Sequence, residues 1–342
     1  MKTHIILTLA LMCMAVTSCE TELDINADIS RQLCVFALAT PGQELEVYVS
    51  STQCIEDAKY ISQKFSLDTY KKGSALKYYK QEYLVDNAQV ILTVNNTTTI
   101  VLPYDSVTLS YHCGYTPTIN DHLDLSVTAE DFEKATASTY IPTPQGISNI
   151  EFTTSYSLAV EASIRDYYDR TDPFNDYFGS DSIAIVKFGF HDPGRETNYY
   201  LLRPRSIAEI YNKTIPNRPV TVYSVSDVFF SEDPVFFDKQ LKKGYGSWEP
   251  YVSNIFTDEL LNGKQNYISF ESRIRRGSVP RIILELQSIS KDLYLYLKSM
   301  QIYERRTDDV FASPVSIYTN VRNGWGIFGS MSSYPQTIYL HR

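Results

Sequence analysis

The sequence has few of the residues on which most metal sites, nucleic-acid sites and membrane-spanning segments depend. Its 342 residues include five cysteines and five histidines, and no two cysteines form a CxxC pair, which excludes a zinc ribbon. Acidic side chains outnumber basic ones by 40 to 31. This balance argues against nucleic acid as a partner, because affinity for nucleic acid depends on neutralising phosphates with Lys and Arg. The apolar run Ile5–Val16 is too short to span a bilayer.

The first twenty residues have the pattern of an exported protein. Lys2 precedes the apolar run, and Thr17-Ser18-Cys19 has the small residues of a cleavage site. A cysteine at this place resembles a bacterial lipobox, in which the thiol is acylated and the preceding residues are removed; an ordinary signal peptide is the alternative. We therefore expect a signal peptide over residues 1–18 and a lipidated tether over residues 19–32. The acidic residues of this tether resemble the surface-export signal of Bacteroidetes-type lipoproteins.

Alternating apolar residues predict a mainly β protein, and the 27 tyrosines support this, because aromatic and β-branched residues favour strands. About seven short strands over about a hundred residues are typical of an antiparallel sandwich of immunoglobulin-like type. We predict this sandwich over residues 33–141. Its expected strands are Leu33–Ala39, Glu44–Ser50, Ala88–Val94, Thr97–Leu102, Val107–Tyr111, Leu123–Val127 and Thr136–Ile141.

Pro142 and Pro144 interrupt the strand pattern, and two prolines so close together do not fit a central strand. They predict a domain boundary, with a second antiparallel β domain over residues 147–342. Leu158–Ile164 is an expected strand of this domain. The turn signal Leu261–Lys264 indicates a meander, because residues on both sides of it alternate in polarity.

One helix is expected in the second domain, over about residues 290–305. Ser290 is a natural N-cap, and Asp292 falls in the first turn, where a carboxylate is favourable. The residues that then recur at helical spacing on one face are Leu293, Tyr296, Leu297, Met300 and Tyr303. This face should pack against the sheet.

Three cysteines remain after the expected processing: Cys34, Cys54 and Cys113. An exported chain permits disulfides, but an odd number allows at most one internal pair. A Cys34–Cys113 bridge would form if their strands are neighbours, and buried free thiols are the alternative.

The C-terminal region carries a family resemblance. Its pieces are Ser290–Leu297, Pro314–Val321 and Asn323–Gly329. In this order they resemble the C-terminal signature of a Bacteroidetes lipoprotein family catalogued only as a domain of unknown function. The resemblance implies a surface or periplasmic accessory role, because members often lie beside genes for TonB-dependent outer-membrane transporters. It implies no catalytic residues.

The glycines of this tail have a physical interpretation of their own. Gly324, Gly326 and Gly329 indicate backbone that bends sharply or approaches another element closely. We interpret the tail as a structural closure of the second domain, and a ligand contact is the alternative.

The sequence offers no positive evidence for catalysis. It contains no nucleophile elbow, phosphate loop or paired metal-binding histidines. His112 and His122 flank Cys113 and Asp121, which is a weak hint of a metal site, but surface histidines explain the pattern better. We therefore expect neither an enzyme, a cofactor nor a metal.

Two groups of residues are candidates for contact or modification. The polar loop 166–182 contains the aromatic residues Tyr167, Tyr168, Phe174 and Tyr177, which offer large contact area at modest ordering cost. Separately, Ser106 and Ser182 each stand between an aspartate and an apolar residue. This triplet resembles the O-glycosylation acceptor of exported Bacteroidetes proteins.

Together these features predict a non-catalytic lipoprotein that is anchored in the outer membrane through Cys19 and is exposed on the cell surface or faces the periplasm. Its predicted role is the binding of a ligand or partner as an accessory of a TonB-dependent transporter. A structural adhesin or fimbria-like surface protein is the alternative. The negative charge gives no reason to expect electrostatic attachment to anionic lipid.

Overall fold

The computed structural model describes residues 31–52, 83–156, 182–194, 196–212, 220–226, 229–237, 253–274, 278–306 and 315–340. In these ranges the protein is mainly β, as the sequence predicts, and it has one α-helix, near the C-terminus. No helix in these ranges has the length and apolar character needed to cross a membrane. The predicted strand Leu158–Ile164 lies outside them.

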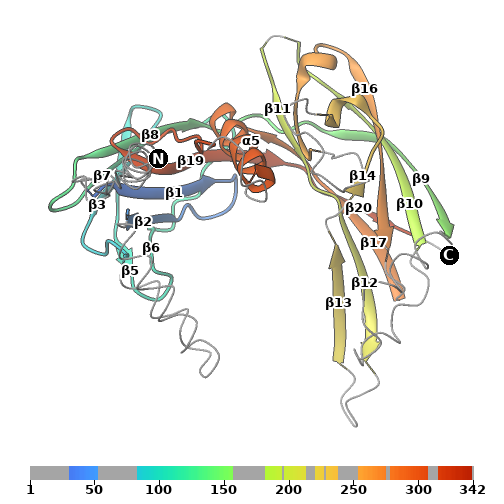
Figure 1. The fold of residues 1–342 in the computed structure, drawn as a ribbon, viewed down its shortest axis with the longest axis horizontal. Coiled ribbons are helices and arrows are strands. Elements are labelled where there is room, and N and C mark those ends of the chain that lie inside the picture. Colours follow the sequence, from blue (N-terminus) through green and yellow to red (C-terminus); the bar gives the residue numbers. More distant parts are fainter. Residues whose placement is uncertain are drawn as a thin grey trace, which may run out of the picture.

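The strands before residue 146 form the first half of the molecule, on the left of Figure 1. They are β1 (Leu33–Ala39), β2 (Val47–Ser51), β3 (Gln89–Val94), β4 (Thr98–Leu102), β5 (Tyr104–Asp105), β6 (Ser110–Tyr111), β7 (His122–Thr128) and β8 (Ala135–Tyr140). Each of the seven predicted strands has a counterpart whose ends lie within three residues of the prediction.

The prediction for Val107–Tyr111 is confirmed only at its end, where Ser110–Tyr111 form β6. Val107 lies in the turn between β5 and β6, and its side chain is 88% exposed. The Asp105 carboxylate accepts a hydrogen bond from the backbone N–H of Val107 (2.8 Å), and Leu109 has a φ of 57°. Such local side-chain bonds to the backbone favour turns, and here the bond outweighs the apolar pattern.

The strands after residue 146 are β9 (Ile147–Tyr156), β10 (Ser182–His191), β11 (Tyr199–Leu202), β12 (Arg205–Asn212), β13 (Val220–Ser226), β14 (Phe229–Phe230), β15 (Ile255–Thr257), β16 (Gln265–Ile274), β17 (Ser278–Leu284), β18 (Leu286–Ile289), β19 (Gly324–Ser333) and β20 (Gln336–Tyr339). Two short 3-10 helices, η2 (Pro234–Phe236) and η3 (Asp258–Leu260), lie between them.

The strands form one sheet of eight strands and three of four. The large sheet has the order β15-β11-β18-β19-β1-β2-β6-β5, and the others have the orders β4-β3-β7-β8, β14-β16-β10-β9 and β13-β12-β17-β20. The predicted boundary at residues 142–146 lies between β8 and β9, which belong to different sheets. The large sheet nevertheless takes four strands from each side of this boundary, so the division into two domains stays a prediction.

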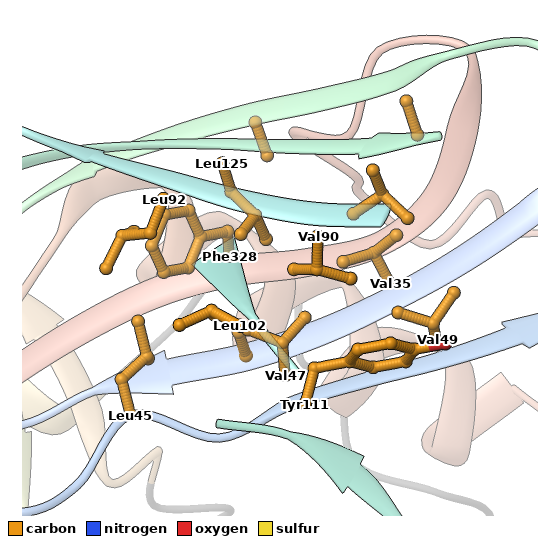
Figure 2. Packing of buried hydrophobic residues seen from close by; sticks show 14 of the residues in the cluster. Val35, Leu45, Val47, Val49, Val90, Leu92, Leu102, Tyr111, Leu125 and Phe328 are labelled. Atoms are coloured by element: carbon orange, nitrogen blue, oxygen red, sulfur yellow. The ribbon is translucent and has the colours of Figure 1, made fainter. Parts of the chain in front are cut away.

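A hydrophobic core fills the space between the β4-β3-β7-β8 sheet and the first half of the large sheet. Alternation in β1 creates one side of it, because Leu33, Val35, Ala37 and Ala39 point inward and are buried. Figure 2 shows Phe328 of β19 in this core, close to Leu92 and Leu125. A C-terminal residue therefore completes the N-terminal sandwich.

The contact between β1 and β19 differs most from the expected fold. The two strands pair in parallel over all seven residues of β1, from Leu33 opposite Gly324 to Ala39 opposite Ser330. On its other side β19 pairs with β18 of the second half. The tail, which we interpreted as a closure of the second domain, therefore closes the first sandwich as well.

The glycines of the tail make this pairing close. A side chain at Gly326, where φ is 110°, would clash with the carbonyl oxygen of Val35. A Cβ on Gly324 would lie 2.6 Å from the carbonyl oxygen of Leu33. The expectation of a close backbone approach is confirmed for Gly324 and Gly326, and the neighbour is β1.

The predicted helix is confirmed as α5, Lys291–Arg306. The Ser290 hydroxyl oxygen caps it by accepting a hydrogen bond from the backbone N–H of Leu293 (3.4 Å), and it also accepts one from Ser330 (3.2 Å). Leu293 is buried with Ile255, Ile289 and Ile327 of the large sheet, and Tyr296 is partly buried against them. Tyr303, expected on the same face, is instead 42% exposed.

Cys34 and Cys113 are free thiols, so the proposed bridge between them is not formed. Cys34 lies on β1 and Cys113 follows β6, and β2 separates these strands in the sheet. Cys54 lies outside the described residues.

The close approach at Gly326 predicts a large effect on stability. Gly326→Ala should lower the free energy of unfolding by about 3 kcal/mol or more, because the methyl group meets the Val35 carbonyl and the backbone conformation is unfavourable for alanine. Gly42→Ala is the matched control: its φ is 75°, but its Cβ would meet nothing within 4 Å, so we expect a loss of about 1 kcal/mol. Denaturant unfolding measures both, and equal losses would contradict this account of the β1–β19 contact.

Candidate functional surface

The sequence-predicted site residues are only partly described by the structure. Cys19 and the loop residues Tyr167, Tyr168, Phe174 and Tyr177 lie outside the described ranges. Ser106 is exposed in the turn between β5 and β6, and Ser182 is the first residue of β10, opposite Tyr156 of β9. Lipidation, loop contact and glycosylation therefore stay predictions.

His112 lies between two carboxylates. Its Nδ1 is 2.6 Å from Glu44 Oε1, and its Nε2 is 3.3 Å from Asp105 Oδ2. The hydrogen bond with Glu44 is the main cause that raises the pKa of His112 above its ordinary value. Because the carboxylates lie at opposite nitrogens of the ring, the cluster links the β1–β2 turn to the β5–β6 hairpin and offers no common point for an ion.

Asp121 anchors a turn. Its carboxylate accepts hydrogen bonds from the side-chain amide of Asn95 (2.8 Å), the backbone N–H of Thr118 (2.8 Å) and the hydroxyl of Tyr115 (3.0 Å). His122 lies instead beside Asp124. The two histidines therefore do not share a site with Cys113 and Asp121, and the described part of the chain contains no group of three or more His, Cys, Asp or Glu side chains that could hold a metal ion.

A buried carboxylate in the second half also has a structural role. Asp192 is fully buried, and its two oxygens accept hydrogen bonds from the hydroxyl of Tyr200 (2.6 Å) and the backbone N–H of Gly263 (3.0 Å). Burial and Asp192 together raise the pKa of Tyr200 far above its usual range. The Asp192 carboxylate and the Tyr200 hydroxyl thus connect the turn at Gly263 to β11, and neither group faces solvent.

An exposed aromatic surface is the best candidate for a functional site. It consists of Phe36 and Leu38 on β1, Tyr48 on β2 and Trp325 on β19, with exposed fractions of 40%, 42%, 43% and 45%. We call these four residues the aromatic face. Phe36 lies opposite Tyr48, and Trp325 opposite Cys34, so the four side chains share the outer side of the large sheet.

Helix α5 covers the neighbouring part of this side. Ile327 of β19 is 7% exposed beneath the helix, whereas Phe36, directly opposite it on β1, is 40% exposed. In Figure 1 the helix lies at the junction between the two halves, beside β19. The helix therefore covers β19 but not β1. On β1 no described element covers the apolar outer side of the sheet.

The aromatic face has little acid–base chemistry. Burial raises the pKa of the Cys34 thiol, which disfavours the reactive thiolate. The Tyr48 hydroxyl donates a hydrogen bond to Glu46 (2.5 Å), and the Trp325 indole N–H donates one to Gln32 (2.5 Å). These bonds orient two of the rings. Contiguous apolar area of this kind suits non-covalent contact with a partner.

The sequence contains a signal for this face that the strand analysis did not use. β1 reads LCVFALA, so both of its sides are apolar. A strand in a sheet with one solvated side normally alternates with polar residues, and apolar residues on both sides indicate cover on both. The core covers one side of β1, and the second apolar side remains to be explained.

A family model matches most of the chain. The family described as Domain of unknown function (DUF4249) matches residues 20–337, which include every strand of the aromatic face and the whole helix. No curated protein matches the chain, and no solved structure matches it.

The His112 cluster predicts a pH-dependent stability. Because the pKa of His112 is raised on folding, its contribution is fully present below the unfolded-state pKa of about 6.5 and is lost as the pH rises through the folded-state value. His112→Gln should therefore lower the unfolding midpoint more at pH 6 than at pH 9. The pKa of Glu44 is lowered by the same hydrogen bond, so its contribution is lost only as the pH falls through that lowered value.

Thermal unfolding of wild type and variant between pH 5 and 9 measures this difference. In a Glu44→Gln background, where the main partner of His112 is gone, the pH dependence of the difference should shrink. A difference that stays constant with pH would contradict the prediction.

Proposed function

This chain belongs to the DUF4249 family, a domain family of unknown function, and from that membership we propose that it is a non-catalytic binding lipoprotein of the cell surface. In this proposal it is anchored in the outer membrane through Cys19 and serves as an accessory of a TonB-dependent transporter. The lipobox-like sequence supports the anchor. The family resemblance supports the class of partner.

The observation that carries the proposal is the aromatic face. Aromatic and apolar side chains at the centre of an interface supply much of the binding energy, and Trp and Tyr are enriched there. Phe36, Tyr48 and Trp325 stand on three adjacent strands, so their backbone positions are fixed before a partner arrives.

The proposed tether would bring this face close to a membrane partner. Leu33, the first residue of β1, follows Cys19 by 14 positions, and a fully extended chain of that length spans at most about 50 Å. Confinement within this distance raises the effective concentration near a membrane protein without requiring high intrinsic affinity. An adhesin or fimbria-like protein, the alternative, would use the same anchor with a partner outside the cell.

The anchor is tested by Cys19→Ala. Without acyl chains the protein loses about 0.8 kcal/mol of membrane binding for each buried CH₂, so the variant should move from the membrane fraction to the soluble fractions. Fractionation of wild type and variant measures the change of location, and intact-mass spectrometry of the wild type measures the attached lipid. Retention of the variant in membranes, together with a wild type that carries no lipid, would refute the anchor.

The partner is tested by affinity purification from gently solubilised outer membranes. We expect wild type to recover a TonB-dependent transporter, and the triple variant Phe36→Thr, Tyr48→Thr, Trp325→Thr to recover at least tenfold less. Threonine suits strands, so the sheet should be retained. Tyr339→Thr is the matched control, because Tyr339 is 53% exposed on β20 and lies outside the aromatic face.

The outcomes separate the parts of the proposal. If the wild type recovers no transporter, the assignment of a TonB-dependent transporter as the partner is refuted. Equal recovery by the triple variant would refute the aromatic face, and alanine at Tyr167, Tyr168, Phe174 and Tyr177 then tests the predicted contact loop in the same assay. Unfolding midpoints of all variants show whether a loss of recovery reflects a loss of fold.

A further inference from the structure

Strand β9 is a long edge strand. It has ten residues, Ile147–Tyr156, and it pairs with β10 on one side only. No described strand pairs with its other side, because β9 ends the order β14-β16-β10-β9. The other strands that lie at the end of a sheet are shorter, from two residues in β5 and β14 to seven in β13. Figure 1 shows β9 at the outer margin of the second half.

Features that normally prevent an edge strand from pairing with another strand occur only at the beginning of β9. The pairing with β10 is irregular between Lys187 and Gly189, and Asn149 nearby has a φ of 50°, which indicates a bulge. Beyond this point the register is regular from Glu151 to Tyr156. This stretch contains no proline and no lysine, the residues that commonly block edge pairing.

Between Glu151 and Thr154 the side chains of β9 are exposed to solvent on both faces. Glu151, Phe152, Thr153 and Thr154 are all exposed, so no described element covers this stretch. Phe152 lies opposite Val186 and Thr154 opposite Ala184, and both partners on β10 are fully buried. Among the described residues, the core of the second half therefore reaches the edge of the sheet at β9 and ends with Phe152, which is 37% exposed.

The two faces of β9 differ in character. Phe152 and Thr154 lie on the core side, in line with Ile150, which packs against the core. Glu151 and Thr153 lie on the opposite side, and Glu151 stands opposite Lys187. A strand added to β9 would thus meet an apolar row on one face and a polar row on the other.

We propose that β9 accepts an extended segment of another protein as an additional strand of this sheet. The backbone N–H and C=O groups along a free edge form a regular ladder only with another extended polypeptide backbone, which defines the chemical class of the partner. The segment carries apolar side chains at alternate positions, and these cover Phe152 and the end of the core. Its remaining positions are polar and face solvent beside Glu151 and Thr153.

This inference is independent of the proposed function. It concerns the second half of the chain, whereas the aromatic face lies on β1, β2 and β19, and it requires neither a lipid anchor nor a transporter. Failure of either proposal would leave the other standing.

The test uses a synthetic peptide and the full chain from residue 20 onward. The probe is a capped seven-residue peptide with valine at alternate positions and threonine or lysine between them. Its control has the same side chains but N-methylated amides on one edge, which removes the backbone donors. Titration followed by fluorescence anisotropy should show saturable binding of the first peptide and at least tenfold weaker binding of the second.

Two adjacent substitutions locate the binding site. Thr154→Lys places an ammonium group on the core side of the edge, where an added strand would bury it, so we expect at least a tenfold loss of peptide affinity. Thr153→Lys places the same group on the polar side, where it stays in water, and should change the affinity less than twofold. Unfolding midpoints show whether both variants keep the fold.

Three results would overturn the proposal. They are no binding of the probe to the wild type, equal binding of the N-methylated peptide, and equal loss in the two lysine variants. Sedimentation provides a further test. A wild-type dimer that Thr154→Lys dissociates would identify a second copy of this chain as the occupant of β9 and would refute the assignment to another protein.

Discussion

The parallel pairing of β1 with β19 is the contact on which both halves of the molecule depend. Gln32 and Trp325, which are 293 positions apart, are joined beside it by a hydrogen bond. Phe328 reaches from β19 into the sandwich core, while Ile327, next to it in sequence, is buried under α5. One strand thus contributes to two cores on opposite sides of the same sheet. Such long-range closure costs chain entropy before it yields contacts, so we expect the sandwich to be completed late in folding.

The tail residues that carry the family resemblance are largely engaged in this closure. Asn320 donates a hydrogen bond to the carbonyl oxygen of Phe328 and accepts one from its N–H, and it also donates to the carbonyl oxygen of Ser138 near the end of β8. Ser330 donates from its hydroxyl to the carbonyl oxygen of Tyr140. These side chains fasten β19 to β8 across the edge of the sandwich. The most specific part of the sequence therefore has a structural explanation, and it provides no ground for a catalytic role.

Turn and cap signals in the sequence were reliable, and signals for long-range contacts were not. The Asn95-Asn96 turn, with φ values of 51° and 57°, joins β3 and β4 as expected, and the Ser290 cap begins α5 where predicted. Each depends on residues within a few positions of one another. The partner of β1 depends instead on a segment almost 300 residues away, and strand periodicity carries no information about which strands pair. For the same reason the aromatic face was missed: Trp325 joins Phe36 and Tyr48 only after β19 has docked.

The titratable clusters of the described structure hold separate segments of the protein together. His112, Asp121 and Asp192 each have partners within the protein, and each links segments that are distant in sequence. Removing a buried bond of this kind, such as the one between Tyr200 and Asp192, leaves a buried polar group without its partner and costs about 1–3 kcal/mol. The apolar outer side of β1 and the backbone edge of β9 carry no such engagement among the described residues. These two surfaces are where contact with another molecule would add interactions without first removing any.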